Sequence, residues 1–468
     1  MDNTKDLFFD GGSETGAGSE EMLLKALTAG YGTDSAQFTG GRALIPEDCE
    51  TTMVNAMREQ REDCKIMNTF KKTPVKSTVH EYNRRTGTGD LEFGTTEEGG
   101  ISHEDSQSIE RVTRNVKYIQ QYREVTEQMN VVDTFENALE SEKLAGTLNI
   151  LKIAERLCIH GDSDVVPTEF DGMIKQIKKT NSARRNIIDF RGGSIPNKGE
   201  KFFAEMTRMI REQGGMANKV FFPLILSDDI QILCRDRLRF GTNDHVMTPV
   251  FDSYPTPLGT VKFGEDAGPD KMFFVRGRVA SKGDPLQKPN APQSVTVAAD
   301  DASGSKFAGG DAGNYIYKVF AINKYGISDG KSPAAAVAVA SGDGVTITIT
   351  PDGTKPGTGF IICRTAPGGT ADQAMEMVRI AKSEDAATVY VDLNDDLPGT
   401  TDMIFITEQR LQAIAEFYQL LPMRLYRMNP VNRLVTPFIL ALWGVLDLKV
   451  PEWCGLTKNI AYQGGLYG

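Results

Sequence analysis

Hydrophobic and polar residues alternate strictly in one stretch of the chain, residues 344–350, where Val345, Ile347 and Ile349 are separated by threonines. This period of two predicts a strand with one buried face and one face in water. Gly, Pro, Asp and Ser bound this run and six similar short runs, at residues 294–299, 314–322, 334–340, 359–364, 376–381 and 387–392. Short strands in this number, with no helix between them, predict a β-sandwich.

A helical period governs an earlier part of the chain. Apolar residues recur every three or four positions, at Phe135, Leu139, Leu144, Leu148, Leu151 and Leu157. Asp133 and Glu136 predict a capping box at the start of this helix, and His160-Gly161 predicts its end. The helix should be about 35 Å long at about 1.5 Å per residue, enough to act as a spine.

Shorter elements lie on both sides of the sandwich. We expect helices at 19–27, within 46–70, at 199–213, after Ser227 and at 408–421, and strands at 77–86, 109–126, 219–226 and 438–450. The apolar run 438–446 is about half as long as a helical bilayer span, so a buried strand is predicted there and no membrane span is expected. These elements neither alternate regularly nor form a bundle, which indicates an α+β protein with the sandwich inserted into it.

The two strands at 77–86 and 109–126 predict a long hairpin whose connecting stretch is polar and glycine-rich. A hairpin with so little apolar material cannot bury itself, so either it is mobile or it lies on a neighbouring subunit. Mixed charge favours salt bridges to an adjacent subunit, although a solvated charged face is the alternative. The candidate contact residues are Arg84, Arg85, Asp90, Glu92, Glu97, Glu98 and Glu104.

The composition is that of a soluble globular protein. The chain has 468 residues, 40% of them hydrophobic, and a net charge of -11, which argues against a main task of binding nucleic acid. The first 18 residues lack the basic and apolar regions of a signal peptide. The cysteines, at positions 49, 64, 158, 234, 363 and 454, follow no metal-ligand or disulfide spacing, which favours reduced thiols in a cytoplasmic setting.

The motifs that could carry catalysis all have a structural interpretation that we favour. Cys158, His160 and Asp162 could pair a thiol with a base, but the helical period buries Cys158 at a helix end. Asp162 and Asp164 could hold a cation, but they lack further oxygen ligands at fixed spacing. The histidines at 80, 103, 160 and 245 are far apart, and the hairpin carboxylates lack the rigid cleft of a glycosidase. We therefore predict no enzyme, and no catalytic, cofactor-binding or metal-binding residue.

The segment from Tyr315 to Asn323, followed by Gly326 and Ser328, resembles the penultimate strand and turn of fibronectin type III and immunoglobulin-like (Ig-like) modules. In those modules this strand comes late, whereas here it precedes the predicted strands 344–350 and 359–364. A rearranged strand order could bring the two ends of the insert together, as insertion into a host loop requires. In the usual order the ends lie at opposite poles.

The order of motifs around the insert resembles a known family. Thr28-Ala29-Gly30-Tyr31-Gly32-Thr33, the helix ending in Ile159-His160-Gly161-Asp162, Leu420-Leu421-Pro422-Met423, the run Phe438-Ile439-Leu440-Ala441-Leu442-Trp443-Gly444 and then Lys449-Val450-Pro451-Glu452-Trp453 are similar to major capsid proteins of tailed bacteriophages with the Hong Kong 97-like fold. The resemblance covers roughly residues 19–280 and 404–463 and is strongest to capsid proteins that carry an Ig-like insertion.

The resemblance implies a domain organisation. It assigns 1–76 to an N-terminal arm, 77–127 to an extended loop hairpin, 128–218 to a peripheral domain with the spine helix, 219–284 to the first part of an axial domain, 285–403 to the inserted Ig-like β-sandwich, and 404–468 to the axial return and peripheral closing strand.

The resemblance also implies a function in assembly. Copies of the chain would form hexamers and pentamers of an icosahedral head that encloses double-stranded DNA, built in the host cytoplasm, with the hairpin lying over a neighbour. Its other partners would be a portal, a cement or decoration protein, a scaffold and a maturation protease, with only weak inner-surface contact to DNA and none to membrane. Some family members crosslink through a lysine in the extended loop, but residues 77–116 contain no lysine, so we expect non-covalent contacts. The competing interpretations are a secreted or tail-associated adhesin or glycan-active protein, and a tail sheath protein.

Overall fold

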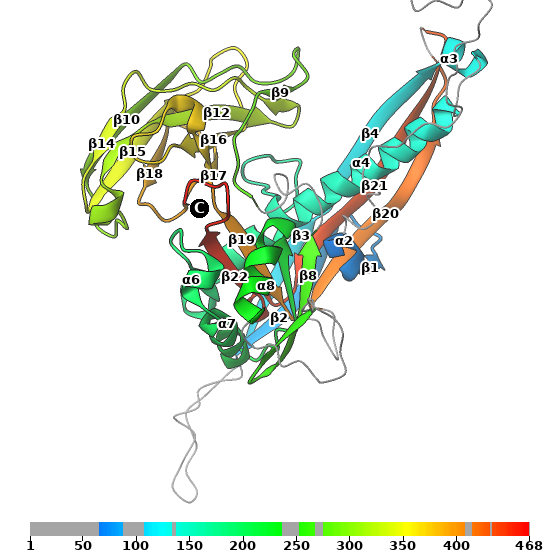
Figure 1. Cartoon of the computed structure of the whole chain (residues 1–468). Helices are drawn as coiled ribbons and strands as arrows, with labels where there is room; N and C mark the ends of the chain where they lie inside the picture. Colours follow the sequence, from blue (N-terminus) through cyan, green and yellow to red (C-terminus); the bar gives the residue numbers. More distant parts are fainter. Residues whose placement is uncertain are drawn as a thin grey trace, which may run out of the picture. The chain divides into compact units, whose positions relative to one another are not determined.

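A computed structural model describes residues 65–87, 107–132, 137–235, 252–266, 275–407, 414–430 and 433–467 (Figure 1). They all belong to one compact unit. Several predictions therefore lie outside the described residues: the helix at 19–27, the Asp133/Glu136 capping box, and the hairpin residues Asp90, Glu92, Glu97, Glu98 and Glu104.

The long predicted helix is present as α4 (Ala138–His160). Its N-cap is Asn137, whose side chain accepts hydrogen bonds from the backbone N–H groups of Leu139 and Glu140. The helix ends at His160, as predicted, and its C-cap Gly161 must lack a side chain, because a Cβ there would lie 2.2 Å from the carbonyl oxygen of Phe170. The other described helices are α2 (Lys65–Thr69), α3 (Glu127–Val131), α5 (Met173–Lys178), α6 (Ile195–Lys198), α7 (Lys201–Glu212) and α8 (Ser227–Arg235).

The helix α4 packs on a four-stranded sheet of order β1-β20-β21-β4 (Figure 1). These strands are β1 (Lys71–Pro74), β20 (Ala415–Arg427), β21 (Val435–Leu448) and β4 (Lys117–Thr126). Ile150, Ala154 and Leu157 of α4 share one buried core with Phe438 and Leu440 of β21. The buried strand predicted at 438–450 is confirmed as β21.

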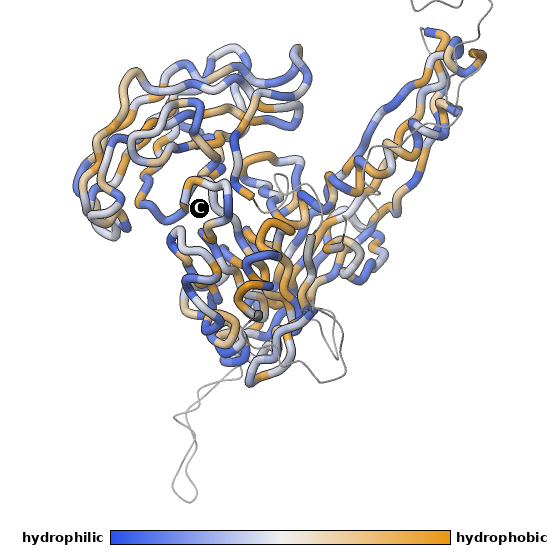
Figure 2. Tube along the Cα trace, viewed as in Figure 1, coloured by the Kyte–Doolittle hydropathy of each residue, from blue (hydrophilic) through white to orange (hydrophobic). Residues whose placement is uncertain are grey.

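A six-stranded sheet forms a second core. Its order is β5-β22-β19-β6-β8-β7, with β5 (Ile187–Asp189), β22 (Gly455–Ile460), β19 (Thr401–Ile406), β6 (Lys219–Pro223), β8 (Gly259–Asp266) and β7 (Ser253–Thr256). The apolar face of α7, with Phe202, Phe203, Met206 and Ile210, is buried against it as predicted. Figure 2 shows hydrophobic positions concentrated where α8 and this sheet lie.

The predicted insert consists of strands, and its core lies between two sheets. One sheet has the order β10-β15-β18, with β10 (Ser294–Asp301), β15 (Asp343–Thr350) and β18 (Thr388–Asp392). The other has the order β17-β16-β12-β13-β9, with β17 (Met375–Ala381), β16 (Gly359–Arg364), β12 (Tyr317–Asn323), β13 (Gly326–Ile327) and β9 (Lys282–Gly283). A third pair joins β11 (Gly313–Tyr315) to β14 (Val337–Val339). Val345, Ile347 and Ile349 are fully buried, so the alternating pattern is confirmed.

The two ends of the insert meet. Val275, before the insert, forms an isolated antiparallel bridge with Thr401 of β19, a host strand that begins shortly before the predicted end of the insert at residue 403. The backbone N–H of Arg276 donates to the carbonyl oxygen of Thr400 at 2.9 Å. The insert also contacts the host, because Val165 and Val166 share a buried cluster with Phe320 of β12. Long bridging linkers are therefore not needed.

One predicted element is wrong. We expected a helix at 408–421, but residues 415–421 belong to strand β20. Phe417, Leu420 and Leu421 have helical spacing, yet the pairing of β20 with β21 shifts register twice after Gln419, which breaks the period of two expected for a strand. The predicted strand 109–126 is interrupted at Val116, so its first half lies in the hairpin and its second half is β4.

Candidate assembly interface

The hairpin consists of β2 (Val79–Gly87) and β3 (Ser108–Asn115), which pair antiparallel. The register places Tyr82 opposite Val112 and Arg84 opposite Glu110. Successive side chains of a strand point to opposite faces. One face of β2 therefore turns inward, and the other stays exposed.

The inward face of the hairpin is held at its root by one buried carboxylate of β21. Asp447 is fully buried, and its Oδ1 accepts a hydrogen bond from Arg114 Nε at 2.7 Å. The Tyr82 hydroxyl donates to the same oxygen at 3.5 Å. Burial and the charge of Asp447 raise the pKa of Tyr82, so the phenol keeps its proton and remains a donor. These contacts fix the direction in which the hairpin leaves the domain.

Arg84 makes its described contacts within its own chain. Its guanidinium donates to Glu110 of β3 at 2.7 Å and to Glu452 at 3.2 Å. This residue therefore helps to fix the hairpin root, while its role toward a neighbouring subunit stays a prediction. Arg85 points to the opposite face and is exposed. The remaining candidate contact residues lie outside the described residues.

The outward face of the hairpin carries exposed apolar residues. Val79 is 40% exposed and Ile109 is 56% exposed. Between them, Arg111 of β3 forms an ion pair with Glu81 of β2. Apolar and paired charged side chains together on an exposed sheet face suit contact with another protein surface.

The sequence contained a signal for the hairpin root that our sequence reasoning missed. Asp447 is the one acidic residue in the apolar run of β21, and a buried charge in such a run needs a partner. Its partner Arg114 is 333 residues away, so local spacing could not identify the pair.

The predicted burial of Cys158 near the end of the helix is confirmed. Cys158 is fully buried, and its Sγ lies 3.9 Å from Met67 Sδ. Burial, and to a lesser degree the charge of Arg379, lower the pKa of His160 to about 3, which leaves it neutral at physiological pH. The buried Cys158 thiol lacks the exposure that a nucleophile requires.

The acidic loop after α4 is organised by a lysine. Lys175 Nζ lies 2.6 Å from Asp162, 2.8 Å from Asp164 and 2.8 Å from Asp171. The ammonium group thus balances the carboxylates that we considered as cation ligands. Among the described residues, no group of three or more His, Cys, Asp or Glu side chains is arranged to hold a metal ion.

Comparison with known proteins gives matches over almost the whole chain. The chain is 24% identical over 463 residues to a protein of Enterococcus phage phiEF24C that is named as a major capsid protein, with 95% of each chain covered. It is similar to phage major capsid proteins. It is also 24% identical over 465 residues to the major capsid proteins of Staphylococcus phages S25-3 and K, covering 95% of this chain and 96% of each of those proteins.

Comparisons with family models and with solved structures support this similarity less strongly. No protein-family model matches the chain. A solved capsid of a native GTA particle is similar in structure, at 10% identity and a TM-score of 0.48, over 92% of this chain and all of that one. A TM-score below 0.5 does not establish a shared fold, so the similarity to capsid proteins rests on the sequence matches. None of the described helices is long and apolar enough to span a membrane.

Proposed function

We propose that this chain is the repeating structural subunit of a tailed-phage capsid. The observation that carries the proposal is the similarity to phage major capsid proteins along 95% of the chain, insert included. A structural role also agrees with the chemistry of the described residues, where the candidate nucleophile is buried and the candidate cation ligands are paired with lysine. The subunits form hexamers and pentamers of an icosahedral head around double-stranded DNA.

The fold proposed for the host is the Hong Kong 97-like fold. The sheet β1-β20-β21-β4 with α4 corresponds to the peripheral domain, and the six-stranded sheet corresponds to the axial domain. The β2–β3 hairpin corresponds to the extended loop that lies over a neighbouring subunit. Its exposed Val79 and Ile109 and its firmly held root support this assignment.

The insert is an Ig-like domain with a rearranged strand order. In Ig-like sandwiches, strands A, B and E share one sheet and strands G, F, C and C′ share the other. Here β10-β15-β18 matches A-B-E, and β13-β12-β16-β17 matches G-F-C-C′. The F and G strands therefore precede B along the chain. The Tyr315 hydroxyl donates to the carbonyl oxygen of Asp311, four residues upstream, as in the tyrosine corner of these domains.

The remaining partners follow from the proposed role. A portal, a cement or decoration protein, a scaffold and a maturation protease complete the assembly in the host cytoplasm, and DNA touches only the inner surface. The adhesin, glycan-active and tail-sheath alternatives are not favoured, because the matched proteins are named as major capsid proteins and the matches extend over nearly their full length.

Electron microscopy of the purified chain tests the proposal. Closed shells or capsomers in negative stain are the expected result. Stacked rings would instead indicate a sheath, and dispersed monomers at all concentrations would indicate an adhesin or enzyme. Either of these two outcomes overturns the capsid assignment.

A further inference from the structure

A short segment ahead of the first strand is packed against the C-terminal half of α4. This root segment comprises α2 (Lys65–Thr69) and Phe70. Ile66, Met67 and Phe70 are 0%, 1% and 5% exposed and belong to the core that α4 shares with the four-stranded sheet. The root segment is therefore an integral part of this core.

One carboxylate of α4 accepts both hydrogen bonds at the start of the root segment. Glu155 is fully buried. Its Oε1 accepts from the backbone N–H of Ile66 at 2.8 Å, and its Oε2 accepts from the N–H of Met67 at 2.8 Å. The first N–H groups of a helix have no partner within the helix, and a buried carboxylate is costly without donors. The contact therefore supplies acceptors to two backbone N–H groups at the start of the helix and donors to the buried carboxylate.

We propose that Glu155 is a positioning residue that fixes the backbone of the root segment against the long helix α4. The apolar contacts of Ile66, Met67 and Phe70 bury the root segment but do not specify its backbone position, because hydrophobic contacts are non-directional. The paired N–H···O bonds are directional and charge-assisted. A tether at the other end of α2 supports the same position, since Lys219 Nζ donates to Thr69 Oγ1 at 2.9 Å.

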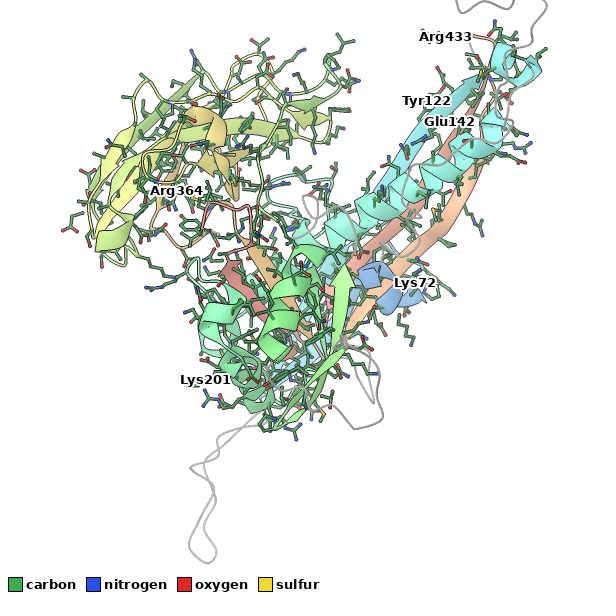
Figure 3. All side chains as sticks on the ribbon, viewed as in Figure 1. Lys72, Tyr122, Glu142, Lys201, Arg364 and Arg433 are labelled. Atoms are coloured by element: carbon green, nitrogen blue, oxygen red, sulfur yellow. The ribbon has the colours of Figure 1, made fainter. Side chains whose placement is uncertain are left out.

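The substitution Glu155→Gln is a sharp test because it changes the contact with little change in shape. A glutamine amide has one acceptor oxygen, so its NH₂ group would face the second backbone N–H. The matched control is Glu142→Gln, which removes the same charge from the same helix at a side chain that is 45% exposed (Figure 3).

Hydrogen exchange of the Ile66 and Met67 amides in the purified full chain measures the effect. In Glu155→Gln we expect these amides to exchange about ten- to a hundredfold faster, the range that corresponds to losing a hydrogen bond to a charged group. Protection of Ile150 and Leu157 in α4 should stay unchanged, and Glu142→Gln should behave as the unmodified chain. Unchanged protection of Ile66 and Met67 would overturn the proposal, and so would an equal loss of protection throughout α4.

A second variant keeps the test decisive if Glu155→Gln does not fold. Glu155→Asp retains the charge but is one methylene shorter, so it cannot reach both N–H groups, and the same local loss of protection is expected. If this variant also loses protection throughout α4, the proposal fails. This readout needs no shell, so it is independent of the proposed capsid function.

Discussion

The buried ion pair of the insert gives the most quantitative prediction. Arg364 is fully buried within the insert, with 0% of its surface exposed to solvent (Figure 3). Its Nη1 lies 2.6 Å from Asp392 Oδ2, and its Nη2 donates to Asn394 Oδ1 at 2.6 Å. The guanidinium also lies 5.2 Å from the centre of the Phe307 ring and 5.1 Å from that of Tyr315.

Substituting Arg364→Met should leave the buried carboxylate of Asp392 without its cation. Asp392 is 1% exposed, and its remaining side-chain donor is the Tyr317 hydroxyl at 2.8 Å. Removing one partner of a buried ion pair costs about 3–5 kcal/mol. We therefore expect the free energy of local unfolding of the insert to fall by about this amount. Because exchange occurs from the opened state, the core amides of the insert should exchange faster by about two to three and a half powers of ten.

The assay can separate the insert from the host. Both tryptophans, Trp443 and Trp453, lie outside the insert, so tryptophan fluorescence during urea unfolding follows the host alone. Hydrogen exchange of β12 and β15 amides follows the insert. The exposed Lys355→Met is the control, and its effect should stay below about 0.5 kcal/mol. Wild-type protection of the insert amides in Arg364→Met would refute the reasoning, because the carboxylate would then tolerate isolation.

Four further predictions follow from the structure and the proposed function. Deleting residues 94–103 should leave soluble subunits that do not close shells in negative stain, and normal particles would contradict a role for the hairpin. Because residues 77–116 contain no lysine, denaturing electrophoresis of mature particles should show monomer, and a ladder would contradict this. Replacing residues 285–399 by a short Gly/Ser bridge should still permit shells, because the pairing of Val275 with Thr401 is retained; failure to assemble would make the insert part of the subunit contacts. Burial lowers the pKa of His160 from about 6.5 in the unfolded chain to about 3 in the folded chain, so the unfolded chain binds an extra proton and stability should fall as the pH drops from about 6.5 toward 3. In His160→Asn, the urea midpoint should fall less over this pH range. An identical pH dependence in this variant would contradict the prediction.

Much of the fold could be predicted from local pattern. The strands of the insert and the helix α4 were found because a period of two and a period of about 3.6 are written into neighbouring residues. Where the local pattern was ambiguous, the prediction failed. The spacing of Phe417, Leu420 and Leu421 fits a helix, and only pairing with β21 makes that segment a strand. The end of α4 at His160 was predictable, because a glycine directly after a helical period is a local signal.

At the candidate interface, the sequence predicted the hairpin but not the ion pairs that hold it. Sequence indicated the hairpin and its charge, since a long polar segment between two strands is a local feature. It could not pair Arg114 with Asp447, or Arg84 with Glu452, because these partners lie 333 and 368 residues apart. The same holds for Glu155, which meets Ile66 and Met67 from 89 and 88 residues away.

The sequence by itself determined the long helix α4, the short strands of the predicted insert and the absence of lysine from residues 77–116. The tertiary structure decided which charges are buried, what each one pairs with, and that the insert begins and ends at paired strands. The physical reason is the separation in sequence of the interacting residues. Periodicity and capping act between neighbours in sequence, whereas burial and ion pairing arise only when distant segments pack together.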